Sequence, residues 1–190
     1  RKYKQATYPG EKIQVDVKHV PTNCMLNEDK EKNIRYYQYT AIDEYSRQRV
    51  VMATKEHSTY ESAKFVKLII KKFKFNIETV QTDNGFEFTN RLSYKADRNT
   101  KTFFEKELEV NNIKHKLIKP RTPKQNGKVE RSHRKDQENL YYEQKFLDFE
   151  DFKRKLSRWI REYNNTGMKP LNWKSPNEYL EEYRKLTAEK

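Results

Sequence analysis

The chain has 190 residues, and its 41 Lys and Arg outnumber its 28 Asp and Glu to give a formal net charge of +13 at pH 7. Only 34% of the residues are hydrophobic, but thirteen Tyr, ten Phe and two Trp supply apolar surface for the core of one domain. A single cysteine excludes a disulfide framework, no Cys/His spacing of the zinc type occurs, and no apolar run has the length of a membrane span.

These properties predict a soluble, cytoplasmic protein, nucleoid-associated in a bacterial host, whose partner is an anionic polymer. The positive charge is unevenly distributed, because residues 111–174 contain seventeen basic and eight acidic residues. Any surface that faces a polyanion should therefore lie in this part of the chain.

Hydrophobic periodicity predicts three strands and a helix in the first part of the chain, at residues 13–17, 34–42, 49–53 and 58–73. Apolar and polar residues alternate in the first strand, so one face of it is polar, and Asp16 lies on that face. The polar stretch 43–48 favours antiparallel pairing of the next two strands, and the three strands form a meander. Ser58 and Glu61 make a capping-box pattern at the start of a helix of about four turns.

The remaining elements are predicted as a strand at 77–82, an aperiodic stretch at 91–101, a helix at 102–110, a strand at 113–118, helices at 122–144 and 148–163, and a short terminal helix from 175. The strand at 77–82 ends at Asp83, and Asn84 and Gly85 form the turn that follows. Thr122 is the expected N-cap of the long helix, and Glu130 lies about two turns into it. This order is the α/β, ribonuclease H-like arrangement, a mixed five-stranded sheet with helices on both faces.

Three stretches, IQVDVKHV, VQTDNGFEF and PRTPKQNGKVERSHR, carry a resemblance to a known family. In order and wording they resemble the DDE catalytic core that retroviral integrases share with bacterial insertion-sequence transposases, over about residues 9–179. The acids of that family lie in the first strand, in an Asp-x-Gly turn after the fourth strand, and in a helix after an Asn-Gly pair. The corresponding residues are Asp16, Asp83 and Glu130, which the resemblance implies are catalytic and bind metal.

The sequence departs from the family pattern in two places. The family separates its second and third acids by about thirty-five residues, whereas 46 residues lie between Asp83 and Glu130. Omitting residues 91–101 restores the usual interval, so we interpret them as an insertion in a catalytic core of residues 1–165. In the tail, residues 166–190, the family's His-containing stretch between REYNN and KSPNEYLEEY is replaced by GMKPLNW.

The resemblance implies metal-dependent DNA strand cleavage at a transposon end, followed by attack of the freed 3′-hydroxyl on target DNA during transposition or integration. Two Mg²⁺ or Mn²⁺ ions roughly 4 Å apart can activate the attacking group and neutralise the leaving oxygen. These hard cations prefer oxygen ligands, which carboxylates supply. The implied partners are the DNA of the transposon ends and of the target, and the implied assembly is a homodimer or a higher oligomer.

Each acid also has a more ordinary interpretation: Asp16 as a solvated strand residue, Asp83 as a turn residue and Glu130 as a surface charge on a helix. Their joint occurrence in the expected elements and order favours the shared site. Among competing groups, Glu87 is interpreted as structural and Asp43 as a turn residue. His133, one turn after Glu130, either approaches the phosphate or is a solvated helix histidine.

Basic and amide residues around Glu130 are candidates for DNA contact: Arg121, Lys124, Gln125, Asn126, Lys128, Arg134 and Lys135. Arg134 lies one helical turn after Glu130 and shares its face, whereas Arg131 points away and is interpreted as a surface charge. The alternative for the whole set is a solvated basic helix. Two other functions stay open, namely a hydrolytic nuclease of the same fold and a non-catalytic DNA-binding protein.

Overall fold

The computed structural model describes residues 5–26, 31–92, 97–119 and 123–188, without the side chains of residues 123 and 124. It contains a mixed five-stranded sheet of order β3-β2-β1-β4-β5. The strands are β1 (Ile13–His19), β2 (Tyr37–Asp43), β3 (Arg49–Thr54), β4 (Thr79–Thr82) and β5 (Lys114–Leu117). β1, β2 and β3 pair antiparallel as the predicted meander, and β1, β4 and β5 pair in parallel. The predicted ribonuclease H-like sheet is confirmed.

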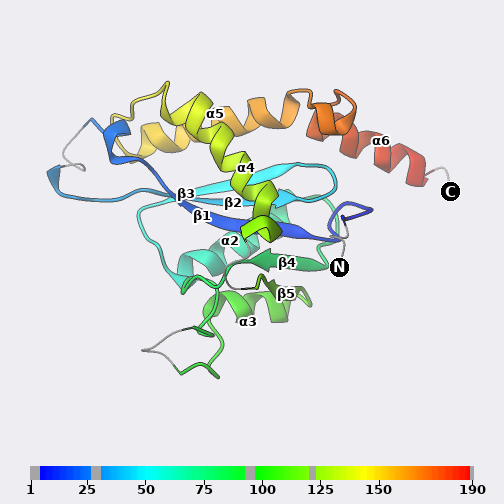
Figure 1. The fold of residues 1–190 in the computed structure, drawn as a ribbon, viewed down its shortest axis with the longest axis horizontal. Helices are drawn as coiled ribbons and strands as arrows, with labels where there is room; N and C mark the ends of the chain where they lie inside the picture. The colour runs from blue at the N-terminus through cyan, green and yellow to red at the C-terminus, as the bar shows by residue number, and fades with distance from the viewer. Residues whose placement is uncertain (1–4, 27–30, 93–96, 120–122, 189–190) are drawn as a thin grey trace.

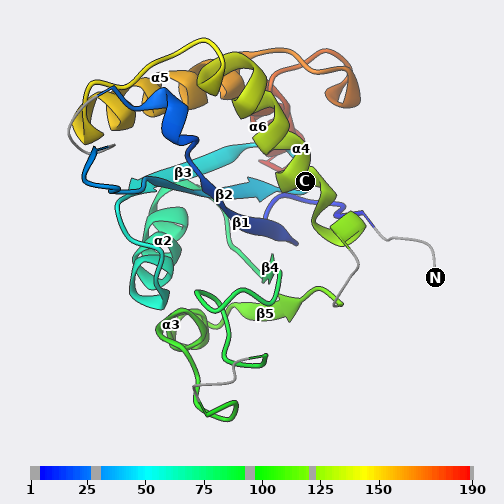
Figure 2. The same cartoon turned by 60° about the vertical axis from the view of Figure 1, so that its left-hand side comes forward.

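The described chain also contains α2 (Thr59–Lys72), α3 (Phe103–Val110), α4 (Gly127–Asp136), α5 (Phe149–Asn165), α6 (Pro176–Ala188) and the short turns η1 (Thr22–Cys24), η2 (Pro123–Asn126), η3 (Gln137–Tyr141) and η4 (Lys169–Leu171). Figures 1 and 2 show α2 and α3 on one face of the sheet and α4 and α5 on the other. Helices on both faces are therefore confirmed. None of the helices in the described ranges is long and apolar enough to cross a membrane.

The alternation of apolar and polar residues along β1 determines what each face of the sheet packs against. Ile13 and Val15 are fully buried in a core that also contains Phe65 of α2 and Phe104 of α3. The opposite face of β1, which the sequence shows as polar, is not open to solvent, because Gln14 is only 1% exposed. On that side α4 packs against β1 and β2, and a second apolar cluster lies under α5. The polar residues of β1 therefore contact a helix.

Most predicted boundaries shift by one or two residues, and two elements differ more clearly. The second strand begins at Tyr37 and not at residue 34, because Tyr37 pairs with His19, the last residue of β1, and residues 34–36 have no strand beside them. The last helix is not short, because α6 continues to Ala188. Residues 91, 92 and 97–101, the described part of the aperiodic stretch, contain no helix or strand, as predicted.

The long helix predicted at 122–144 is divided into three parts. Its expected N-cap, Thr122, lies outside the described residues, and the described part begins as the 3₁₀ turn η2 before α4. After Asp136 the chain continues as the π-helical turn η3 and ends at Tyr141. The i→i+5 geometry of a π-helix turns residues five apart towards one side. Asp136 and Tyr141 can therefore both bind Gln38 of β2.

Candidate active site

The register of two central strands brings the first two candidate acids together. β1 and β4 pair in parallel with Gln14 opposite Gln81, and each glutamine is followed two residues later by an aspartate, Asp16 or Asp83. Side chains two residues apart share a face, and neighbouring strands lie about 4.8 Å apart. Both aspartates are half-buried. The repeated Gln-x-Asp pattern thus puts Asp16 in β1 and Asp83 one residue beyond the end of the adjacent strand β4.

The turn after β4 fixes the Asp83 carboxylate. Its Oδ1 accepts a hydrogen bond from the Gly85 backbone N–H at 2.9 Å, and the Asn84 side chain donates to the Ile118 carbonyl at 3.0 Å. A side chain at Gly85 would displace the Glu87 carboxylate, because an added Cβ would lie 2.5 Å from Glu87 Oε2. The Asp-Asn-Gly turn therefore holds Asp83 at the end of its strand.

Glu87 and Asp43, the competing carboxylates, have other partners. Glu87 is 5% exposed, and its Oε1 lies 3.0 Å from His57 Nε2. Asp43 is fully buried and accepts hydrogen bonds from the Gly10 N–H at 3.0 Å and from the backbone and hydroxyl of Ser46 at 2.7 and 2.6 Å. Both carboxylates thus bind groups within the protein, and Asp43 forms the predicted turn.

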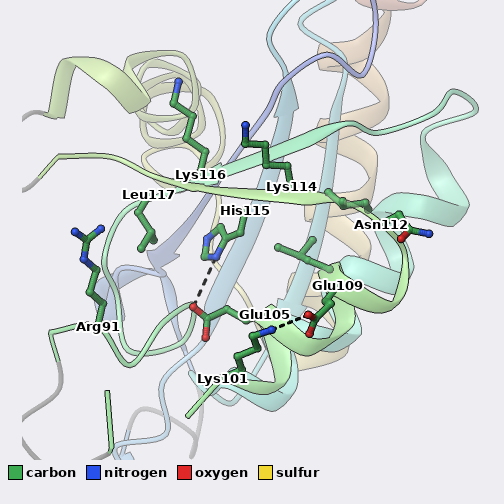
Figure 3. A pocket seen from close by; sticks show the side chains of 11 residues that line it. Arg91, Lys101, Glu105, Glu109, Asn112, Lys114, His115, Lys116 and Leu117 are labelled. Carbon is green, nitrogen blue, oxygen red and sulfur yellow. Dashed lines mark hydrogen bonds and ion pairs between the residues drawn. The ribbon is translucent and has the colours of Figure 1, made fainter. Parts of the chain in front are cut away.

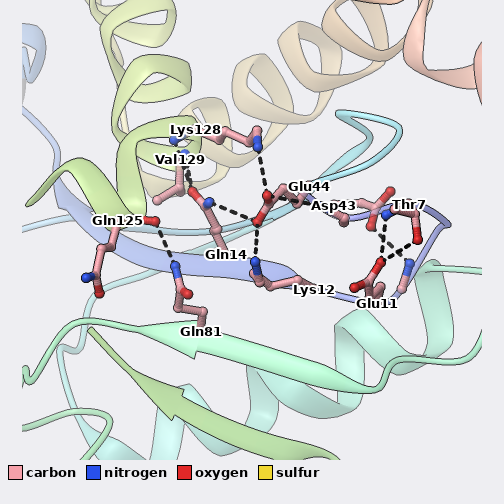
Figure 4. A network of polar contacts seen from close by, with 12 residues as sticks. Thr7, Glu11, Lys12, Gln14, Asp43, Glu44, Gln81, Gln125, Lys128 and Val129 are labelled. Atoms are coloured by element: carbon pink, nitrogen blue, oxygen red, sulfur yellow. Dashed lines mark hydrogen bonds and ion pairs between the residues drawn. The ribbon is translucent and has the colours of Figure 1, made fainter. Parts of the chain in front are cut away.

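Helix α4, which carries Glu130, is attached to the sheet by a side chain of β1. Gln14 Oε1 accepts hydrogen bonds from the backbone N–H groups of Lys128 and Val129, at 3.0 and 3.2 Å (Figure 4). The first N–H groups of a helix have no partner within the helix, so Gln14 caps α4 from the neighbouring strand. Glu130 follows one residue after the second of these bonds.

Two further amides fix the turn that leads into α4. Gln81 Nε2 donates to the Gln125 carbonyl at 2.8 Å, as Figure 4 shows, and Asn126 Nδ2 donates to the Val15 carbonyl at 3.2 Å. No role of Gln14 or Gln81 was predicted from the sequence. Their signal was their shared position two residues before each aspartate.

The electrostatics of the three acids show that they influence one another. Burial raises the pKa of Asp83, and the negative charge of Asp16 raises it further. Burial also raises the pKa of Glu130; the charges of Asp16 and then Asp83 act in the same direction, while His133 opposes them. Like charges near a carboxyl disfavour its ionised form, so each acid makes its neighbours easier to protonate.

His133 lies against the first acid. Its Nδ1 is 3.3 Å from Asp16 Oδ2, and the residue is 8% exposed. Within the described residues, its Nε2 is buried without a hydrogen-bond partner. The interpretation of His133 as a solvated histidine is therefore wrong, because α4 packs against β1 and the His133 ring lies between them.

The three acids fit a divalent cation by their chemistry, although their side chains are not arranged as a ligand set. Among the described residues, no group of three or more His, Cys, Asp or Glu is gathered closely enough to hold a metal. Asp16 instead accepts from the Val17 N–H at 2.9 Å and faces His133, and Glu130 is exposed. Their donors are carboxylate oxygens, the ligands that Mg²⁺ and Mn²⁺ prefer, and a cation would relieve the repulsion among them.

Comparison with known proteins assigns the family. Two family models, each described as an integrase core domain, match residues 6–123 and 111–167. The chain belongs to the integrase core domain family. The matched residues include the whole sheet, α4 and α5, and so contain all three acids.

Relatives of this integrase core include a viral protein and solved structures of retroviral integrases. It is 31% identical over 177 residues to "Putative integrase ORF3" of Spiroplasma virus SpV1-C74, with 88% of this chain and 47% of that protein covered. The chain thus spans about half the length of this curated relative. The trimeric HTLV-2 integrase catalytic core in complex with magnesium matches with a TM-score of 0.60 at 18% identity, covering 92% of this chain and 99% of that one.

A chain in the cryo-EM structure of the simian T-cell lymphotropic virus intasome with PP2A regulatory subunit B56 gamma matches with a TM-score of 0.64 at 17% identity, covering 93% of this chain and 56% of that one. These similarities show that the integrase core has the fold of the retroviral enzymes.

The predicted DNA-contact residues of the integrase core include side chains that bind other parts of the protein and side chains that are exposed. Asn126 is 2% exposed and binds β1, and the Lys128 amine forms an ion pair with Glu44 Oε1 at 2.9 Å. Both side chains therefore bind groups within the protein. Arg134 and Lys135 are exposed on α4 and are available to a ligand.

The remaining candidates lie in and before η2. Gln125 is half-buried, and its Oε1 accepts from the Lys119 N–H at 3.2 Å. Arg121 and the side chain of Lys124 lie outside the part of the chain that the structure describes. Of the seven predicted contacts, Arg134 and Lys135 are the ones that the structure shows exposed.

A cavity of about 740 Å³ between α3 and the edge strand β5 is a poor alternative site for this integrase core (Figure 3). Its lining mixes the cations Arg91, Lys101, Lys114 and Lys116 with the acids Glu105 and Glu109. Lys101 Nζ lies 2.6 Å from Glu109 Oε1, and His115 Nδ1 lies 3.9 Å from Glu105 Oε1. Burial lowers the pKa of His115. None of the three candidate acids lines this cavity.

Proposed function

We propose that this integrase core is a metal-dependent polynucleotidyl transferase that cleaves DNA strands and joins 3′-hydroxyl ends to target DNA. Asp16, Asp83 and Glu130 are its catalytic and metal-binding residues. The observation that supports this proposal is the pairing of Gln14 with Gln81, because an aspartate follows two residues later on each of these adjacent strands, and Gln14 also binds the start of α4, the helix that carries Glu130.

The residues around the site would prepare it for phosphodiester chemistry. Bound Mg²⁺ or Mn²⁺, two ions in all, would supply activation of the attacking water or hydroxyl and neutralisation of the leaving oxygen. Asp16 and Asp83 would hold the ions from the rigid sheet, and Glu130 would complete the set from α4. His133 would orient the Asp16 carboxylate through the contact that it already makes.

DNA would approach along the exposed side of α4, where Arg134 shares the face of Glu130 and would bind phosphates beside the reacting bond. The retroviral relatives include dimeric and trimeric forms of a catalytic core and an intasome. We accordingly propose a homodimer or higher assembly that acts on DNA ends and target DNA. Residues 1–165 would form its catalytic unit, and residues 166–190 its tail.

Neutral replacement of each acid tests the proposal. Asp16→Asn, Asp83→Asn and Glu130→Gln should each reduce Mg²⁺-dependent strand cleavage about a thousandfold, because each removes several kcal/mol of charge stabilisation. Cleavage of a labelled DNA end measures the loss, and circular dichroism confirms the fold. Glu138→Gln is the matched control, because Glu138 is exposed just beyond α4.

Full activity in any one acid variant would remove that residue from the mechanism. A pre-cut DNA end separates the proposed transferase from a hydrolytic nuclease, because only the transferase converts it into joined products. A non-catalytic DNA-binding protein would show no Mg²⁺-dependent nicking at all.

A further inference from the structure

A basic cavity lies on the side of α4 that faces away from the candidate acids. It has a volume of about 690 Å³ and is bordered by the start of α4, the end of α5 and the segment around η4. Its five cations are Arg47, Lys128, Arg131, Lys135 and Lys169, and no acid is among the described residues that line it. This volume is typical of small-molecule pockets, which span about 300–1,000 Å³.

Helical spacing separates this cavity from the acidic site. Lys128, Arg131 and Lys135 follow one another at intervals of three and four residues and so share one face of α4. At about 100° per residue, Glu130 lies about 100° around the helix from Arg131 and about 140–160° from Lys135 and Lys128, so it points away from that face. A ligand in the cavity would therefore lie across the width of one helix, about 10–12 Å, from the proposed reacting bond.

Three of the five cations are available to a ligand. Lys128 is paired with Glu44, and the Arg47 guanidinium donates to the Glu44 carbonyl. Arg131, Lys135 and Lys169 are exposed, and none of them forms an ion pair with an acid in the part of the chain that the structure describes. Exposed cations without acidic neighbours attract an anion.

An exposed aromatic ring borders the same cavity. Trp173 is 73% exposed, and both it and Asn172 have left-handed backbone conformations, with φ of 65° and 54°. Such values are costly for a bulky residue and persist only where surrounding structure holds them. Here the Trp173 N–H donates to the Met168 carbonyl at 3.0 Å, and a side chain at Gly167 would overlap the Trp173 carbonyl oxygen.

The segment that presents Trp173 belongs to GMKPLNW, the stretch that departs from the family wording. Residues 168–173 also lie beyond the end of the matches to the integrase core models, at residue 167. The ring thus lies outside the part of the chain that the integrase core models match. Neither the proposed strand transfer nor the apolar core accounts for its exposure.

We propose that this cavity binds an unpaired segment of a DNA strand, with phosphates on Arg131, Lys135 and Lys169 and a base stacked on Trp173. Basic grooves lined with exposed aromatic rings bind single-stranded nucleic acid in this way, whereas the bases of a duplex are stacked on each other and cannot reach such a ring. The choice of DNA over RNA rests on the proposed function. The site would hold a strand beside the reacting end.

Fluorescence provides the test, because the chain has two tryptophans and only one of them borders the cavity. Trp159 donates its indole N–H to buried Asp136 at 2.7 Å. Titration with a fluorescein-labelled oligothymidylate in EDTA, where no metal-dependent cleavage occurs, should quench Trp173 in the wild-type chain. Fluorescence anisotropy in the same titration gives the affinity.

Trp173→Leu should weaken oligothymidylate binding about tenfold, because it removes a stacked base contact. Trp173→Phe keeps an aromatic ring and should retain most of the affinity. Arg131→Glu combined with Lys135→Glu should weaken binding more than Lys153→Glu combined with Arg158→Glu, a pair on α5 with the same change in net charge. Binding of a duplex of equal length should not change in Trp173→Leu.

Unchanged oligothymidylate binding in Trp173→Leu would overturn the proposal, as would an equal loss of duplex binding. Tighter binding of the matching RNA strand would overturn the assignment to DNA. The readout is independent of the proposed function, because binding is measured without metal. Acid variants that retained cleavage would refute the catalytic proposal and leave the binding result standing.

Discussion

At the scale of single residues, the Asp136 carboxylate determines how α4 ends. It is fully buried and accepts from Arg49 at 2.8 and 2.6 Å, from Trp159 at 2.7 Å and from Gln38 at 2.8 Å. These donors belong to β2, β3 and α5. One carboxylate thereby joins the helix that carries Glu130 to the sheet and to the neighbouring helix.

Removal of the Asp136 charge should destabilise the fold strongly. Asp136→Asn would leave the buried Arg49 guanidinium unpaired, at a cost of about 3–5 kcal/mol. Urea unfolding measures this loss, and Glu138→Gln should stay within about 0.5 kcal/mol of wild type. The double variant Arg49→Met, Asp136→Leu should recover most of the stability. A loss under about 1 kcal/mol in Asp136→Asn would contradict this role.

The same ion pair makes stability depend on pH in acid. Burial acts to raise the pKa of Asp136, but the charge of Arg49 and the hydrogen bonds outweigh it and hold the pKa below its usual 3.8. A carboxyl whose pKa is lower when folded contributes its stability above its unfolded pKa and loses it as the pH falls through the folded value. Unfolding free energies measured below pH 4 should fall less steeply in Arg49→Met, Asp136→Leu than in wild type.

At the scale of elements, the start of α4 depends on side chains of the strands beneath it. Gln14 and Gln81 bind the entry to this helix, and Asn126 binds back to β1. No residue of the helix itself provides a side-chain cap at Asn126. The position of Glu130 is therefore set by the same two strands that carry Asp16 and Asp83.

Gln14→Ala should weaken the proposed site more than it weakens the fold. It leaves two helix N–H groups without their partner and should cost about 1–3 kcal/mol of stability. Glu130 would also be displaced, so half-maximal cleavage should require more Mn²⁺. Ile160→Val, in the core under α5, is the comparison variant. It should cost about 0.5–1.5 kcal/mol of stability and leave the Mn²⁺ requirement for cleavage unchanged. Equal metal dependence in the two variants would show that Gln14 only stabilises.

The elements could largely be predicted from sequence because their signals are local. Alternation identified β1, and capping residues identified the start of α2. The features that were predicted wrongly depend on contacts with residues distant in the chain. β2 starts at Tyr37 because β1 ends opposite it, and His133 is buried because α4 packs on β1. The role of Gln14 could not be derived before the strand register was known.

At the scale of the whole molecule, α4 separates two surfaces of opposite character. One side carries Glu130, and the other carries the basic cavity bordered by Trp173. The net charge of +13 predicted a polyanionic partner but could not locate its contacts. The packing of α4 determines which of its cations are exposed, since Lys128 is turned onto Glu44 while Arg131 remains exposed.

We propose that Asp16, Asp83 and Glu130 form one metal site, and a crystal structure of the protein soaked in Mn²⁺, with anomalous data, is the sharpest test. We expect manganese density between Asp16 and Asp83, with Glu130 turned inward as a further ligand. Density elsewhere, or none at these acids at a Mn²⁺ concentration that supports strand cleavage, would refute the shared metal site.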